Sequence, residues 1–345
     1  MEAQIKPTPK ALVENGIIHN GFFETPFRRA NLLDAKNMGG KLARPLRWLR
    51  LKEWVGFGIN HPRLFGGIII QDAKYASSGT VYLYDKESRK QYEWLVVDLP
   101  GRIEIAETLW NAHCHAGFAG RWVKFEHNLD NLNHRLHAEF KASAGSPSLK
   151  VDLLLHQDWT ATDPLVVSLP IAPDHHTYTH KSPLHAEGFI QIGDERFDFD
   201  PQRDLMNLDE QKTFYPYRSN WHWACFGGHT DEGRELMLNV VDQMTEKGQP
   251  GEDAIWLDGR LTLIEQPEFI PENGNGAYRL EDPAGRIRLH FTPEGSKAER
   301  RNYFLIDMDY EQFFGRYNGE ITDEDGNTHR IKDMFGALER MKARF

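Results

Sequence analysis

Apolar and polar residues alternate with a period of two along most of the chain. Between residues 135 and 141 every odd position is polar and every even position is apolar, and residues 149–153 and 286–291 repeat the pattern. Such alternation is typical of a β-strand with one face on a core. We count about sixteen such segments at spacings of about 10 residues, a density typical of β-barrels or β-sandwiches.

Turn residues stand where antiparallel hairpins need them. Three short dipeptides each separate two alternating segments: Gly193-Asp194, Asp258-Gly259 and Asp325-Gly326. Dipeptides of this kind favour the tight turns that connect neighbouring antiparallel strands. We therefore expect an all-β fold of antiparallel meanders, and two eight-stranded units would account for the strands.

Helical spacing is scarce. We expect one short helix near residues 201–212 and a short C-terminal helix, where Met334, Leu338 and Met341 recur at helical spacing. The C-terminal helix would cap or plug the mouth of a barrel. The basic stretch 44–52 alternates charged with apolar residues and predicts a solvated strand face.

A domain boundary is expected near the middle of the chain. Pro170, Pro173 and Pro183 accompany a His-rich stretch in which the alternation is interrupted. Because clusters of Pro mark connections between packed units, we predict one domain over residues 20–183 and a second over residues 184–345.

Composition narrows the partners and the compartment. The 345 residues are 40% apolar and 12% aromatic, which suits large cores or an apolar cavity, and the net charge is −10. Nucleic acid would require clustered cations that this chain lacks. Cys114 and Cys225 lie far apart and do not form a disulfide framework, and no apolar run approaches the roughly 20 residues of a membrane span. We expect a cytoplasmic protein with no nucleic-acid partner and no stable membrane insertion, compatible with a homodimer.

Common cofactor and metal patterns are missing. The sequence has no Walker pattern, no Gly-x-Ser-x-Gly elbow and no Cys-x-x-Cys pair, which disfavours nucleotide-dependent chemistry and serine hydrolysis. His113 and His115 would share one strand face, as ligands of cupin-like metal sites do. Because no Glu follows His115 at the cupin spacing, we expect no metal and no cofactor, unless the fold brings a third ligand to this pair.

The candidate site residues gather in and around aromatic segments. Trp221 and Trp223 would share one strand face near Tyr217 and Asn220, where indoles can grip an apolar ligand or stabilise a carbocation. The alternative is that both indoles only fill a barrel core. Asp209 precedes this segment and is a candidate general acid.

Two further segments carry candidate charges. His180 and Lys181 lie at the predicted boundary, where a His can shuttle a proton and a Lys can bind a carboxylate tail. Lys181 could equally pair with a carboxylate that docks the two domains. Lys52 and Trp54 would share one strand face. They could form part of a ligand site, or Lys52 could form a cross-strand ion pair with a Glu that Trp54 covers.

Five segments, in this order, resemble a family that is catalogued only as a domain of unknown function: residues 52–54 (Lys-Glu-Trp), 72–75 (Asp-Ala-Lys-Tyr), 178–181 (Tyr-Thr-His-Lys), 217–224 (Tyr-Arg-Ser-Asn-Trp-His-Trp-Ala) and 314–319 (Phe-Gly-Arg-Tyr-Asn-Gly). Through it the chain resembles carotenoid 1,2-hydratase, tocopherol cyclase and AttH-like proteins, over residues 20–345. The resemblance implies two consecutive lipocalin-like (calycin) β-barrels. The Asp of the hydratases' second-barrel motif is absent from residues 220–223, so no catalytic residue is carried over.

Three functions remain open on these grounds. The first is a cofactor-independent hydratase, cyclase or isomerase acting on an isoprenoid-like or lipid-like substrate, with Asp209, His180 or Tyr217 as proton donors. Its ligand-binding residues would be Trp221, Trp223, Asn220, Lys181, Lys52 and Trp54. The second is a lipid or fatty-acid carrier, in which Lys52, Lys181 or Arg218 anchors a head group. The third is an interaction module whose barrels are filled by their own side chains.

Overall fold

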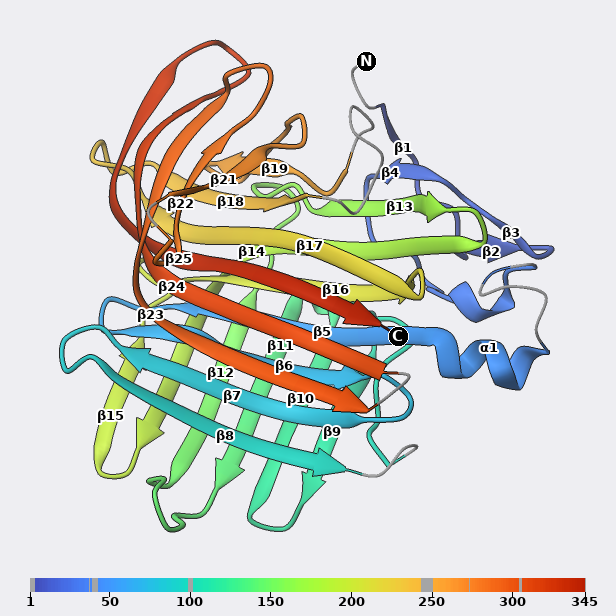
Figure 1. Ribbon diagram of the computed structural model, residues 1–345, viewed down its shortest axis with the longest axis horizontal. Coiled ribbons are helices and arrows are strands. Elements are labelled where there is room, and N and C mark those ends of the chain that lie inside the picture. Colours follow the sequence, from blue (N-terminus) through green and yellow to red (C-terminus); the bar gives the residue numbers. More distant parts are fainter. Residues whose placement is uncertain are drawn as a thin grey trace.

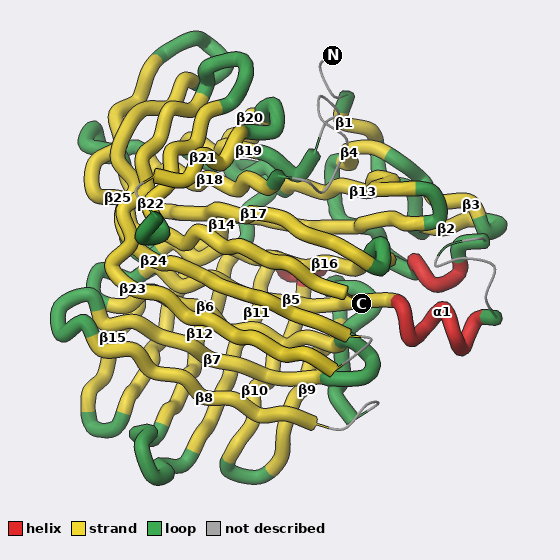
Figure 2. The backbone as a smooth tube through the Cα atoms, in the orientation of Figure 1, coloured by secondary structure: helices red, strands yellow, loops and turns green. Residues whose placement is uncertain are grey.

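The computed structural model describes residues 4–36, 38, 43–98, 102–242, 251–272, 274–303 and 306–344. Over these residues the protein is almost entirely β-structure, as the alternation predicts (Figure 1; Figure 2). The helical elements described are α1 (Arg44–Arg50) and the 3₁₀ helices η1 (Leu32–Asp34) and η2 (Leu129–Asn131).

The first sheet has fourteen strands and curls into a nearly closed barrel. The two ends of its main path come together, since β8 (Lys90–Asp98) contacts β9 (Ala112–Phe118). A Cβ atom on Gly79 of β7 (Ser77–Asp85) would lie only 2.8 Å from the side chain of Ala116 of β9. Neighbours along the main path are β8 (Lys90–Asp98), β7 (Ser77–Asp85), β6 (Leu64–Asp72), β5 (Leu51–Asn60), β16 (Leu205–Phe214), β14 (His175–Ile192), β12 (Leu149–His156), β11 (Asn133–Phe140), β10 (Arg121–Asn128) and β9 (Ala112–Phe118).

Short strands extend this sheet at its side. β13 (Leu165–Ala172) and β15 (Glu195–Phe199) pair with β14, β13 also pairs with β4 (Gly21–Phe23), and β4 pairs with β1 (Ile5–Lys6). A separate hairpin joins β2 (Val13–Glu14) to β3 (Ile17–Ile18).

The barrel interior follows the period-two pattern of its strands. In β11 the residues Leu136, Ala138 and Phe140 are buried in the interior core, together with Val55 and Phe57 of β5. Each large apolar side chain buried in this way contributes about 1.5–3 kcal/mol to folding. The expected strand at residues 135–141 is therefore confirmed with the expected face inward.

The second sheet has nine strands and forms a half-barrel over its own core, which includes Leu238, Leu289 and Leu338. Its order is β20 (Arg260–Leu263), β19 (Ala254–Leu257), β18 (Glu235–Val241), β17 (Arg218–His229), β25 (Thr328–Arg344), β24 (Ile306–Thr322), β23 (Ile287–Tyr303), β22 (Ala277–Glu281) and β21 (Glu268–Glu272). All three expected hairpin turns are present, at residues 193–194, 258–259 and 323–327.

Both expected helices are wrong. The C-terminal segment forms strand β25, and residues 205–212 belong to strand β16. Met334 and Leu338 face the half-barrel core, whereas Phe335 and Ala337 pack against the first sheet. Because both faces of β25 are buried, its apolar residues no longer alternate with polar ones and imitate helical spacing. The strand predicted at residues 44–52 is wrong in the opposite direction, because residues 44–50 form helix α1.

The expected boundary lies inside a strand. Residues 183 and 184 belong to β14, where Pro183 pairs with Asn207 of β16, and the Pro-rich stretch forms the hairpin of β13 and β14. The chain passes from the first sheet to the second between Phe214 and Arg218. As a statement about independent folding units, the division at residue 183 stays a prediction.

The two sheets pack face to face. Phe65 and Tyr84 of the first sheet contact Phe314, Phe335 and Cys225 of the second sheet in one apolar cluster. In Figure 1, β24 and β25 lie over β6 and β7, the strands that they contact through this cluster. The layer between the sheets is thus built from the outer face of the barrel and the convex face of the half-barrel, and it contains four of the predicted site residues: Trp54, Lys181, Asp209 and Trp221.

Candidate functional site

Three neighbouring strands of the first sheet present polar side chains to the second sheet. Lys181 of β14 lies opposite Asp209 of β16, and Gln211 of β16 lies opposite Trp54 of β5. Side chains alternate across a strand, so these residues share the outer face while their neighbours point into the barrel. The fold therefore brings Trp54, Lys181 and Asp209 together, as three of the predicted site residues.

An aromatic stack crosses from the first sheet to the second. The ring of Trp54 stacks on Tyr215 with centroids 6.4 Å apart, and Tyr215 stacks on Trp221 with centroids 5.3 Å apart. Interplanar angles of 12° and 15° make this a nearly parallel column. Trp221 belongs to β17, so the column ties the half-barrel to the barrel and offers an extended apolar wall.

Lys181 links carboxylates from both sheets. Its Nζ lies 2.7 Å from Asp209 Oδ1 and 3.4 Å from Glu252, which precedes β19. Burial alone would lower the pKa of Lys181, but the charges of Asp209 and Glu252 raise it above its usual range. Lys181 is therefore a buried cation, and this geometry fits the docking interpretation of the residue.

Asp209 is the more accessible of these two carboxylates. Its side chain is 20% exposed, against 8% for Glu252, although it lies between two sheets. The indole Nε1 of Trp54 lies 3.4 Å from Oδ1 of Asp209. The facing sheets therefore do not close over the Asp209 carboxylate.

The sequence interpretation missed Glu339. This residue of β25 lies opposite Trp223 in the sheet, and its Oε1 accepts a hydrogen bond of 3.0 Å from Trp221 Nε1. Burial raises its pKa to about 7, with a further contribution from the charge of Asp209, while hydrogen bonds from Trp221 and Tyr310 act in the opposite direction. A carboxyl that titrates near neutral pH is suited to general acid or base chemistry.

His180 points away from this layer. It lies inside the barrel with its Nδ1 3.4 Å from Glu210 Oε2, and both side chains are fully buried. The ring nitrogens of His180 and both carboxyl oxygens of Glu210 make no hydrogen bond among the described residues. His180 therefore belongs to a second polar cluster, which also contains His127 and His134 with their Nδ1 atoms 3.0 Å apart.

Burial of these histidines should make the protein acid-sensitive. Burial lowers the pKa of His134 to about 3. As the pH falls below about 6.5, His134 is therefore protonated in the unfolded chain but stays neutral in the folded protein. The contribution of neutral His134 to the free energy of unfolding is fully present above about pH 6.5 and decreases below it. Between pH 7 and pH 5 this effect should lower the free energy of unfolding by about 2 kcal/mol. In urea denaturation, the free energy of unfolding of His134→Gln should fall less between pH 7 and pH 5 than that of the wild type. The exposed control His113→Gln should lose as much stability over this range as the wild type does.

The other predicted site residues lie outside the stack. Tyr217 is 43% exposed and Asn220 is also exposed. Trp223 is half-buried and its Nε1 donates a 2.8 Å hydrogen bond to Asn239. Lys52 is buried, with its Nζ 4.7 Å from the Tyr75 ring centroid and a lowered pKa of about 7, caused by burial and by Lys74. The binding roles of these four residues stay predictions.

The His113 and His115 pair is not part of a metal cluster in the described structure. His113 lies on the outside of the barrel and contacts Glu104 at 2.8 Å. Over the described residues, no group of three or more His, Cys, Asp or Glu side chains is arranged to hold a metal ion. Cys114 and Cys225 are both free and buried.

Fold and site together define the class of protein: a nearly closed antiparallel barrel followed by a half-barrel, with an acidic and aromatic site between them. The chain belongs to the family described as Domain of unknown function (DUF2804), which matches residues 2–345. No curated protein matches the sequence.

Several solved structures are similar to this chain at low sequence identity. CghA, solved with Sch210972, has a TM-score of 0.55 at 9% identity, over 84% of this chain and 87% of CghA. An AttH-like protein from Nitrosomonas europaea has a TM-score of 0.48 at 15% identity, over 84% of this chain and 92% of its own. Kievitone hydratase from Nectria haematococca has a TM-score of 0.47 at 10% identity, over 85% and 88% of the two chains.

In the described ranges, no helix is both long enough and apolar enough to span a membrane.

Proposed function

We propose that the protein binds a hydrophobic small molecule between its two sheets and adds water to it, cyclises it or isomerises it by acid–base catalysis without a cofactor. The observation that carries this proposal is Glu339, a carboxyl with a pKa of about 7 that is hydrogen-bonded to one end of an aromatic stack. The shared fold of CghA, which was solved with Sch210972, supports the idea that this architecture can hold a small molecule.

The chemistry follows from the positions of the groups. Protonated Glu339 donates its proton to an unsaturated carbon or carbonyl oxygen of the substrate and becomes a carboxylate. The outer faces of Trp54 and Trp221, which do not stack on Tyr215, stabilise the resulting positive charge. Addition of water, or loss of a different proton, completes the reaction, and the partly exposed Asp209 accepts the released proton. Lys181, whose Nζ lies 2.7 Å from Asp209 Oδ1, keeps this carboxylate in position.

The first test is native mass spectrometry of the protein as purified, followed by organic extraction of any bound molecule. An apolar ligand should be present in the wild type and in Trp122→Leu, whose indole lies on the outside of β10, and it should be lost from Trp221→Leu. A ligand that remains in Trp221→Leu would exclude the site between the sheets.

Isotope uptake then separates catalysis from carriage. The extracted molecule is incubated with the protein in water enriched in ¹⁸O and deuterium. Incorporation of ¹⁸O indicates hydration, and deuterium alone indicates isomerisation or cyclisation. If neither isotope is incorporated, the protein carries the molecule unchanged and the catalytic proposal fails.

A further inference from the structure

A pocket opens between the sheets at the far end of β5 from Trp54. Its volume is about 410 Å³, and its walls include Asn60 and Lys86 from the first sheet and Arg316 and Phe335 from the second. The apolar cluster of Phe65 and its neighbours separates it from the aromatic stack, so it is a distinct site. No step of the proposed reaction uses it.

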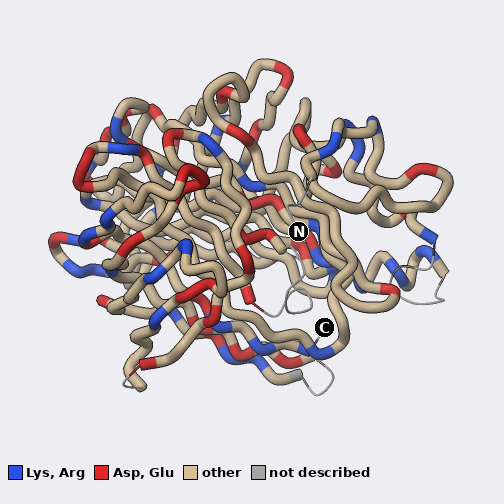
Figure 3. The backbone as a smooth tube through the Cα atoms, turned by 90° about the horizontal axis from the view of Figure 1, so that it is seen from above, with Lys and Arg blue, Asp and Glu red and all other residues tan. Residues whose placement is uncertain are grey.

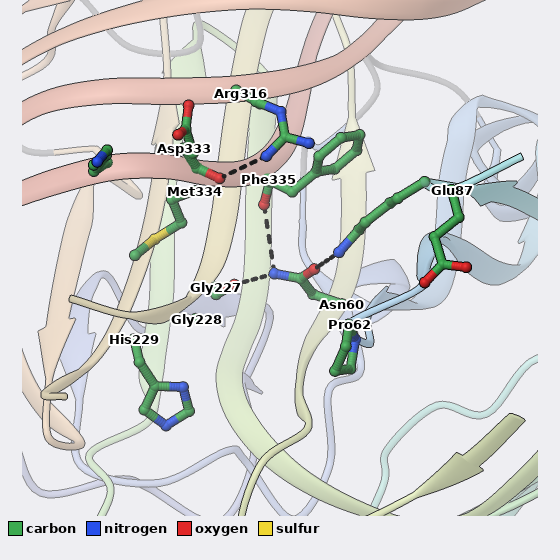
Figure 4. A pocket seen from close by; sticks show the side chains of 12 residues that line it. Asn60, Pro62, Glu87, Gly227, Gly228, His229, Arg316, Asp333, Met334 and Phe335 are labelled. Atoms are coloured by element: carbon green, nitrogen blue, oxygen red, sulfur yellow. Dashed lines mark hydrogen bonds between the residues drawn. The ribbon is translucent and has the colours of Figure 1, made fainter. Parts of the chain in front are cut away.

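Asn60 fixes the geometry of this pocket. Its Nδ2 donates to the backbone carbonyls of Gly227 and Phe335, which joins the two sheets, and its Oδ1 accepts a 2.7 Å hydrogen bond from Lys86 Nζ (Figure 4). Lys86 Nζ donates a second hydrogen bond of 2.8 Å to His61 O. An ammonium group has three N–H donors, so these contacts hold Lys86 in place and leave one donor for a ligand.

Two cations meet over a single aromatic ring. Lys86 Nζ lies 4.9 Å and the guanidinium carbon of Arg316 lies 5.8 Å from the centroid of the Phe335 ring. Figure 4 shows Arg316 beside that ring. Glu294 binds Nε of Arg316 at 2.6 Å, on one side of the guanidinium group.

Charges of both signs surround these two cations. Burial and the charge of Arg316 lower the pKa of Lys86 to about 7, against the opposing charges of Asp204 and Glu294. The pocket is completed by Lys332, His229, Glu87 and Asp333, and Glu87 is itself paired with Arg63 at 3.1 Å. Elsewhere along the chain Lys and Arg are interspersed with Asp and Glu, in a protein of net charge −10 (Figure 3).

We propose that this pocket binds the anionic group of a small molecule, a carboxylate or a phosphate, between Lys86 and Arg316. The anion accepts hydrogen bonds from the third N–H of Lys86 and from Nη2 of Arg316, because Nε of Arg316 already donates to Glu294 and its Nη1 donates to Asp333 O. The anion also relieves the repulsion between the two cations. Asn60 acts as a positioning residue, because it orients Lys86 and connects the two walls. A bound anion thus contacts both sheets.

The test is isothermal titration of the full-length protein with inorganic phosphate in one arm and with hexanoate in the other. Binding of either probe should weaken at least tenfold in Lys86→Met and in Arg316→Met, and it should be unchanged in Lys342→Met, an exposed residue of β25 outside the pocket. Binding of phosphate alone identifies a phosphorylated ligand, and binding of hexanoate identifies a carboxylate.

Two results would overturn the proposal. One is that neither probe binds the wild type, and the other is that both substituted proteins bind as tightly as Lys342→Met. Because Arg316→Met also removes the partner of Glu294, Lys86→Gln serves as a second variant that preserves the hydrogen bond to Asn60 and should still lose binding. Circular dichroism confirms that each variant is folded.

Discussion

Replacement of Lys181 by Met should lower the free energy of unfolding by about 3–5 kcal/mol. Lys181 is 2% exposed and neutralises Asp209 and Glu252, one from each side of the interface between the sheets. Removing the cation leaves two carboxylates close together in a buried site. Burial already raises the pKa of Glu252, and loss of the Lys181 charge raises it further, so the deficit should grow as the pH is raised from 5 to 8. Urea denaturation at both pH values measures it.

A rescue experiment separates charge from packing. Adding Asp209→Asn and Glu252→Gln to Lys181→Met removes the two unpaired charges, and the triple variant should regain most of the lost stability. If Lys181→Met costs less than about 1 kcal/mol, or if the triple variant is no more stable than the single one, the ion pairs do not hold the sheets together.

Glu339→Gln should reduce turnover of the identified substrate by 10²–10⁴-fold, which is about the contribution of one positioned general acid. The substitution keeps the hydrogen-bonding shape next to Trp221 but removes the proton that is transferred. The wild-type rate should fall as the pH rises through about 7, because the protonated form of Glu339 is lost. The residual rate of Glu339→Gln should lack this step.

Stability provides an independent readout for the same variant. Since the folded-state pKa of Glu339 is raised, its contribution to stability is present below pH 4.5 and is lost as the pH rises through 7. Glu339→Gln should therefore be no less stable than the wild type at pH 8. Glu311→Gln is the matched control, because Glu311 lies on β24 and pairs with Arg340 outside the site. Equal loss of turnover in both variants would contradict a role for Glu339 as the acid.

The sequence predicts the strands correctly where one face of the strand is exposed to solvent. Strand β11 alternates clearly because its even residues face the barrel core and its odd residues face solvent. Strand β25 lies between the half-barrel core and the first sheet, so both of its faces carry apolar residues: Leu338 on one face and Phe335 and Ala337 on the other. No local pattern distinguishes such a strand from a buried helix, and the pairing that decides between them comes from distant residues.

The same error concealed part of the site. Asp209, Lys181, Trp54 and Trp221 lie in segments that the sequence interpretation selected, and the fold brings them together. Glu339 was missed because its segment was assigned to a helix. In a strand, Glu339 lies two residues from Ala337 and therefore shares the face that packs against the first sheet.

Alternation also limits which neighbours can act together. His180 and Lys181 are consecutive in β14 and must point to opposite faces, so they cannot belong to one site. The structure places His180 inside the barrel beside Glu210 and Lys181 between the sheets beside Asp209. This separation could have been predicted from the sequence as soon as the segment was recognised as a strand.

The central claim is that the layer between the sheets contains a carboxyl group poised to exchange a proton near neutral pH. The most direct test follows the indole ¹H–¹⁵N resonance of Trp221, which donates to Glu339, from pH 4.5 to pH 9 by NMR. The resonance should shift with a midpoint near pH 7 in the wild type and should not titrate in Glu339→Gln. A midpoint at the ordinary carboxyl pKa near 4.5, or a titration near 7 that persists in Glu339→Gln, would contradict the account.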